Sequence, residues 1–176
     1  MGNPKPVFSL IWGFTIVSSA FFARSLYNTI ISVVPRFYIG IFVAAVLLST
    51  LTFVTCKVSG FLKNRPRIST GMVLQLILSC GVLGVLFYSL DLPEEKIHIL
   101  LYSSLGALRL FEIQDKNKIF QVAEFVFLFS LMSECLQGVI PGRFYDIRDI
   151  GIDTLSGAAG AALMGVILTC ERRKEK

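Results

Sequence analysis

The chain has 176 residues, of which 54% are hydrophobic and 16% are charged, and its mean hydropathy is +0.70. Because charged residues make up about 25% of a typical soluble domain, this composition excludes an ordinary soluble protein and predicts an integral membrane protein. The formal net charge of +5 is then explained by basic residues in cytoplasmic loops, so nucleic-acid binding is not expected.

Six apolar runs follow one another along the chain, and most are close to the ~20 residues needed to cross the hydrocarbon core. They cover residues 7–23, 37–55, 72–90, 97–111, 119–136 and 150–170. We therefore predict an all-α polytopic membrane protein, a bundle of about six transmembrane helices. The fourth run is the shortest. It crosses only if Glu95 and His98 lie at one interface while Arg109 extends its side chain to the other.

The first run also has features of a secretory signal, since Lys5 precedes it and Ser18-Ser19-Ala20 resembles a cleavage site. We expect the helix to be retained, because its removal would leave an odd number of crossings. With six crossings and a cytoplasmic segment between the second and third runs, 12 of the 17 basic residues lie on the cytoplasmic side. The sequence thus predicts cytoplasmic termini and a multi-pass protein of the inner (cytoplasmic) membrane.

We divide the chain into residues 1–71, with two helices that carry almost no ionisable side chain, and residues 72–176, with four helices. The four cysteines are scattered, so no disulfide is expected. Their spacing and the single histidine match no metal-binding pattern, and no glycine-rich phosphate loop is present. We therefore expect neither a metal ion nor a cofactor.

Helical spacing brings polar residues of the last three runs onto shared faces. At 100° per residue, Glu95, His98 and Tyr102 lie on one face of the fourth helix. The fifth and sixth helices have stripes made of Ser130, Glu134 and Gln137, and of Asp149, Asp153, Gly157 and Gly160. We expect these polar ends to converge under the 141–149 loop at the outer surface. Small residues at 156–162 favour close helix packing, including self-association.

Ionisable groups beside helices in lipid are costly, so they usually have a function or a partner. Our candidate ligand-binding residues are Glu95, Lys96, His98, Tyr102, Glu134, Gln137, Arg143, Asp146, Asp149 and Asp153. Glu134 is the hardest to explain structurally, because its carboxylate needs a cation or a proton donor, such as Arg143, Lys96 or His98. The simpler explanation for the charges of the 143–149 loop is a set of ion pairs, and for His98 a hydrogen-bonded helix end.

Four motifs in this order resemble the signature of the VanZ-like family of small bacterial membrane proteins, over roughly residues 85–170. They are Glu95-Lys96 with His98, Tyr102 and Leu105-Gly106; Glu134 with Gln137; Pro141-Gly142-Arg143 with Asp146 and Asp149; and Asp153 with Gly157 and Gly160. The family more often has Asp at the position of Glu95 and often Asn at that of Asp153. Both departures keep a polar oxygen in place.

The resemblance implies that some members lower sensitivity to teicoplanin-type glycopeptide antibiotics. We therefore expect a non-enzymatic protein that binds or screens an envelope component at the outer leaflet, a membrane lipid or a lipid-linked envelope precursor. The first alternative is a membrane enzyme acting on a lipid-linked head group, with His98 as acid or base and Glu134 or Asp149 orienting it. The second is a proton-coupled transporter, although charges at helix ends give no path across the centre.

Overall fold

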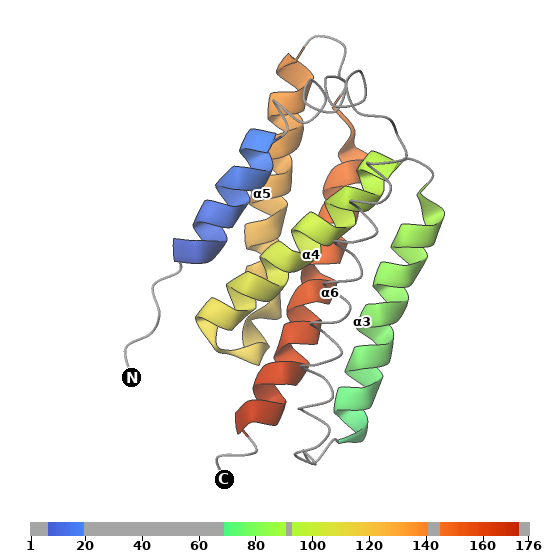
Figure 1. Cartoon of the computed structure of the whole chain (residues 1–176), viewed down its shortest axis with the longest axis vertical. Helices are drawn as coiled ribbons and strands as arrows, with labels where there is room; N and C mark the ends of the chain where they lie inside the picture. Colours follow the sequence, from blue (N-terminus) through green and yellow to red (C-terminus); the bar gives the residue numbers. More distant parts are fainter. Residues whose placement is uncertain (1–6, 20–68, 91–92, 141–144, 173–176) are drawn as a thin grey trace, which may run out of the picture. The chain divides into compact units, whose positions relative to one another are not determined.

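The computed structural model describes residues 7–19, 69–90, 93–140 and 145–172 (Figure 1). Every regular element in these ranges is helical, so the predicted all-α class is confirmed for this part of the chain. The elements are an N-terminal helix (Val7–Ser19), α3 (Thr70–Ser89), α4 (Pro93–Ile113), the 3-10 helix η1 (Lys116–Lys118), α5 (Ile119–Val139) and α6 (Ile147–Arg172). The predicted helix at 37–55 lies outside the described residues.

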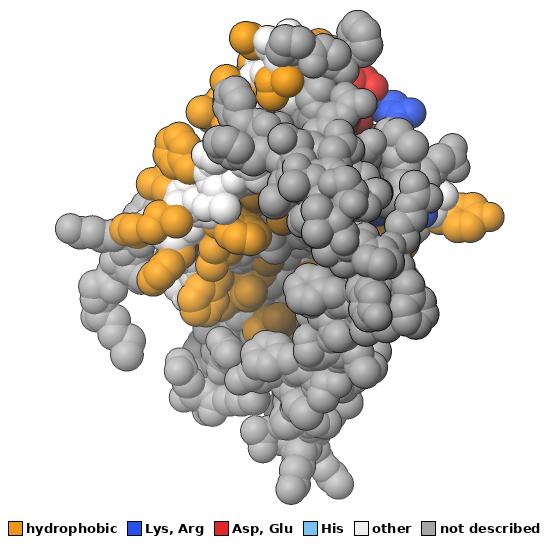
Figure 2. Space-filling view, turned by 45° about the horizontal axis from the view of Figure 1, so that its top comes forward, with side chains coloured by type: hydrophobic (Ala, Val, Ile, Leu, Met, Phe, Trp, Pro, Cys, Tyr) orange, Lys and Arg blue, Asp and Glu red, His pale blue; other side chains and the backbone are white. Residues whose placement is uncertain are grey.

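Three of these helices are long and apolar enough to cross a membrane, namely α3, α5 with η1 (Lys116–Val139) and α6 (Ile147–Cys170). The N-terminal helix is apolar but shorter over its described residues. Large hydrophobic side chains such as Phe8, Leu74 and Ile77 are exposed, and Figure 2 shows hydrophobic side chains gathered on one face. These features are those of a membrane protein. The six crossings and the cytoplasmic termini remain predictions.

The described residues belong to one compact unit, in which α6 contacts α3, α4 and α5. Its core contains Tyr102 and Leu105 of α4, Val122 and Val126 of α5, and Ala161 of α6, all fully buried. The central position of α6 follows from its composition, because its small residues let neighbouring helices approach its backbone. The polar groups described below lie at the two ends of α4.

Glycines bring α4 and α6 into backbone contact. A Cβ atom added to Gly106 would overlap the carbonyl group of Gly157, and one added to Gly160 would overlap the carbonyl group of Ser103. Gly157 also faces the side chain of Val126 on α5. The close helix approach predicted for residues 156–162 is therefore present, and α4 of the same chain occupies this surface.

The N-terminal helix runs antiparallel to α4, as two side-chain contacts show. Trp12 Nε1 donates a hydrogen bond of 2.9 Å to Ser104 Oγ, and Ser9 lies further along α4 beside Glu112. Phe14 packs edge-on against Phe129 of α5, with ring centroids 5.4 Å apart. The helix is thus part of the same core as the C-terminal helices.

A tight turn after α4 reverses the chain into α5. Gln114 takes a positive φ of 58°, which is uncommon for a residue other than glycine, and its backbone N–H donates to the Leu110 carbonyl at 2.9 Å. Asp115 then accepts the Asn117 backbone N–H through its side chain at 3.0 Å. The turn places the C-terminal end of α5 beside the N-terminal ends of α4 and α6.

Candidate functional site

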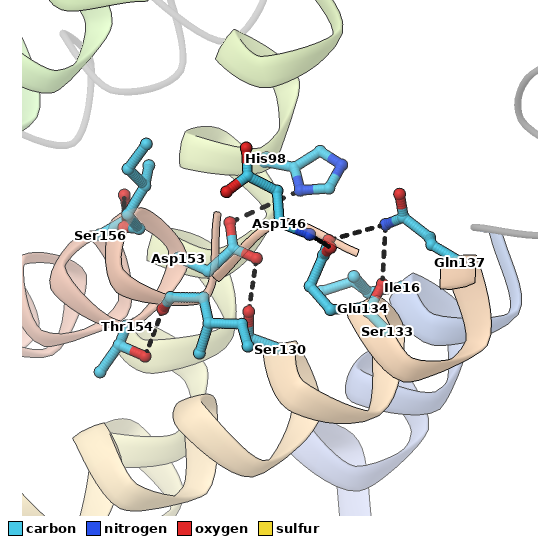
Figure 3. A network of polar contacts seen from close by, with 12 residues as sticks. Ile16, His98, Ser130, Ser133, Glu134, Gln137, Asp146, Asp153, Thr154 and Ser156 are labelled. Carbon is cyan, nitrogen blue, oxygen red and sulfur yellow. Dashed lines mark hydrogen bonds and ion pairs between the residues drawn. The ribbon is translucent and has the colours of Figure 1, made fainter. Parts of the chain in front are cut away.

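Polar side chains from α4, α5 and α6 meet at this end of the unit (Figure 3). We call this group the His98 cluster; it consists of His98, Ser130, Ser133, Glu134, Gln137, Asp146 and Asp153. Helical spacing predicted that these faces would converge, and the structure confirms that α4, α5 and α6 contribute to one group. The individual partners differ from those expected.

Asp153 is the buried centre of the His98 cluster, with a side chain that is 1% exposed. Its Oδ2 atom accepts a hydrogen bond of 2.7 Å from Ser130 Oγ, and its Oδ1 atom lies 3.5 Å from His98 Nδ1. A carboxylate held away from water needs such partners, because an isolated buried charge is very costly. The His98 side chain is 30% exposed, so it connects the buried carboxylate to the surface.

Glu134 is also buried, but neutral donors satisfy its carboxylate. Gln137 Nε2 donates to Oε1 at 3.0 Å, and the backbone N–H of Asp146 donates to Oε2 at 3.1 Å. Lys96, one of the expected cation partners, instead places its Nζ atom 5.1 Å from the centre of the Phe87 ring on α3. The expectation that Lys96 pairs with Glu134 was therefore wrong. Through its bond to the Asp146 N–H, Glu134 instead joins α5 to the segment that begins α6.

Asp146 caps the N-terminus of α6. Its Oδ1 atom accepts the Arg148 backbone N–H at 2.8 Å, and its carbonyl oxygen accepts the Asp149 N–H at 3.2 Å. Both contacts satisfy N–H groups that have no partner within the helix. Asp149 lies in the first turn, where a negative charge is favoured by the helix dipole.

The remaining predicted residues lie beside or outside the His98 cluster. Tyr102 is fully buried below it, with its ring centroid 6.0 Å from that of His98. The side chain of Glu95, in the first turn of α4, and the whole of Arg143 lie outside the described residues.

A second polar group, absent from the sequence predictions, lies at the other end of α4. We call it the Glu112 cluster; it consists of Ser9, Arg109 and Glu112. The buried Glu112 carboxylate accepts the Ser9 backbone N–H at 2.8 Å and the Ser9 hydroxyl, and it lies 3.7 Å from Arg109 Nη1. The Arg109 guanidinium stacks over Phe125 at 4.6 Å. The rule that singled out Glu134, a carboxylate in an apolar helix, would also have found Glu112.

The chemistry available to the His98 cluster is that of an oriented imidazole. Ser130 donates its hydroxyl hydrogen to Asp153 and does not contact the imidazole in a hydrogen bond, so His98 does not activate it as a nucleophile. Within the described residues, no three His, Cys, Asp or Glu side chains are placed to hold a metal ion. The cluster can therefore bind a polar group or exchange a proton with one through His98.

Comparison with known protein families shows which family the chain belongs to. A family model described as VanZ/LLP1 matches residues 7–168. The chain belongs to the VanZ/LLP1 family. This VanZ/LLP1 region is longer than the stretch of matching motifs and includes the N-terminal helix and the Glu112 cluster. No curated protein and no solved structure matches the chain.

Proposed function

We propose that this VanZ/LLP1-family protein binds the head group of an envelope lipid or lipid-linked precursor at the outer leaflet of the cytoplasmic membrane. By binding or screening that component, it lowers susceptibility to teicoplanin-type glycopeptides. One observation carries the proposal: the partly exposed imidazole of His98 belongs to a polar network in which the carboxylates of Asp153 and Glu134 are buried and hydrogen-bonded. Such a network offers one oriented polar contact at a helix end.

The charge pattern supports this location and this ligand. Basic residues in the loops favour the orientation in which the N-terminal ends of α4 and α6 face outward. Arg148 is exposed there, and Arg143 precedes it in the sequence by five residues. Guanidinium groups bind phosphate well because their N–H groups form a planar fork. An anionic head group is therefore the ligand that fits best.

The contact between Asp153 and His98 supports one alternative. A carboxylate that orients an imidazole is a common arrangement for general acid or base catalysis, so a membrane enzyme acting on a lipid-linked head group is the second candidate. The carboxylate within 4 Å of His98 is that of Asp153, whereas the sequence prediction named Glu134 or Asp149 for the orienting role. The proton-coupled transporter gains no support, because Leu105 and the glycine contact separate the two polar clusters of α4.

Retention of the ligand tests the proposal. The full chain is purified in mild detergent from a bacterial host, and the bound envelope components are identified by native mass spectrometry. We expect an anionic lipid or lipid-linked precursor on the wild type. His98→Ala should lose it at normal abundance, because the substitution removes the partly exposed imidazole and leaves no polar group in its place.

Cys135→Ser is the matched control, since Cys135 is an exposed thiol on α5, close to Glu134 in the sequence. It should retain the component as the wild type does. Equal retention by His98→Ala and the control would contradict the proposed site. A covalently altered lipid that appears only with the wild type would favour the enzyme.

A further inference from the structure

The two oxygens of Asp153 have different partners, and this difference has consequences for His98. Oδ2 accepts the Ser130 hydroxyl at 2.7 Å, so the carboxylate is held with Oδ1 toward the imidazole, 3.5 Å from Nδ1. Ser130 is fully buried, so this hydrogen bond lies inside the helix packing. Without Ser130, the carboxylate would be free to rotate about its Cβ–Cγ bond.

The position of the carboxylate decides which histidine nitrogen carries the proton. A neutral imidazole has one N–H and one bare nitrogen, and a carboxylate oxygen beside Nδ1 stabilises the form with Nδ1–H. In an imidazolium, Nδ1 likewise carries a proton toward Asp153. In both states Nε2 is the nitrogen left for a ligand, and Figure 3 shows the second ring nitrogen facing away from Asp153.

We infer that Ser130 is a positioning residue that acts through Asp153, holding His98 with Nδ1 toward the carboxylate and Nε2 toward the ligand. This inference rests on the proposed function, which supplies the ligand. It assigns the contact with that ligand to one atom, His98 Nε2. It adds Ser130 to the site. Glu134 and Asp149 also lie within electrostatic range of His98, and the Tyr102 ring lies 6.0 Å from the imidazole.

The single histidine of the chain makes the inference directly measurable. The full chain is labelled with ¹⁵N-histidine and studied by NMR in detergent micelles, so that all imidazole signals come from His98. We expect Nδ1 to carry a hydrogen-bonded proton in the wild type. Asp153→Asn and Ser130→Ala should shift or lose the Nδ1–H signal, because the first replaces the charged acceptor by a neutral amide and the second leaves the carboxylate free to rotate.

Ser156→Ala is the matched control, since Ser156 is a buried hydroxyl on α6, three residues from Asp153, and it donates to the Ile152 carbonyl at 2.7 Å. Its spectrum should be that of the wild type. If Ser130→Ala does not fold, Ser130→Cys replaces the hydroxyl by a weaker donor of similar size and should shift the signal in the same direction. A wild-type spectrum with a bare Nδ1, or spectra unchanged by both Ser130 variants, would overturn the inference.

This measurement is independent of the proposed function, because it is made before any envelope component is added. Nδ1 protonation with no retained lipid would refute the binding role while leaving the positioning role intact. A bare Nδ1 with lipid retained would refute the positioning role and leave the binding role intact. Each of the two proposals can therefore be refuted without refuting the other.

Discussion

The contact between α4 and α6 at Gly106 gives the sharpest prediction about packing. An added Cβ atom would lie 2.6 Å from the carbonyl carbon and 2.9 Å from the Cα atom of Gly157, whereas ordinary contacts begin at 3.4 Å. The Gly157 carbonyl oxygen lies closer still, so Gly106→Ala requires α4 and α6 to move apart, because the neighbouring atoms are backbone and cannot move aside as a flexible side chain would.

The cost follows from overpacking a tight helix interface. Such substitutions typically cost about 1–3 kcal/mol, and the better helix propensity of alanine returns up to about 1 kcal/mol. We expect Gly106→Ala to lower the free energy of unfolding by about 1–2 kcal/mol. The separation would also lengthen the 3.5 Å contact between His98 and Asp153, because those residues lie on the same two helices.

Reversible unfolding of the purified chain in mixed micelles measures this effect. The control is Gly151→Ala on α6, where an added Cβ atom meets nothing within 4 Å. It should unfold like the wild type or be slightly more stable, through helix propensity alone. If Gly106→Ala and Gly151→Ala have the same free energy of unfolding, the close α4–α6 contact does not contribute to stability as the structure implies.

Three further predictions concern the polar clusters and the topology. Ser9→Ala removes a donor from the buried Glu112 carboxylate and should cost about 1–3 kcal/mol in the same unfolding assay, whereas Ser19→Ala, which loses only a bond within its own helix, should cost less. Glu134→Gln turns one carboxylate oxygen into an NH₂ group that faces another donor, so it should also cost about 1–3 kcal/mol, and abundance equal to that of the wild type would refute this structural role. Cysteine-accessibility labelling tests the orientation, and labelling of position 144 from the cytoplasm would reverse it. Positions Lys63, Lys116 and Lys176 should report the cytoplasm, and Glu94 and Phe144 the outside.

The helices were predictable because hydrophobic composition determines them directly. The predicted runs 72–90, 119–136 and 150–170 correspond to α3 (Thr70–Ser89), α5 (Ile119–Val139) and α6 (Ile147–Arg172). The run 97–111 fell short of α4 (Pro93–Ile113), since polar residues at both of its ends obscured the pattern. Those polar residues are tolerated because they pair with other helices, as Glu112 does with Ser9.

The faces of the site were predictable from helical spacing, but its pairings were not. Spacing placed His98, Glu134 and Asp153 at one end of three helices, and they meet there. Spacing does not give the rotation of each helix, so Lys96 lies against Phe87 instead of Glu134. Nor does it reveal backbone donors such as the Asp146 N–H, or the pair formed by Ser9 and Glu112 across 103 residues.

Teicoplanin susceptibility of cells that carry His98→Gln tests the central claim most directly. Glutamine keeps a polar side chain but cannot serve as an acid or base, a role typically worth about 10² to 10⁴ in rate. With membrane abundance matched to the wild type, a binding or screening protein should retain part of its protection. Complete loss of protection, together with a covalently altered envelope lipid that only the wild type produces, would contradict the binding role and establish an enzyme.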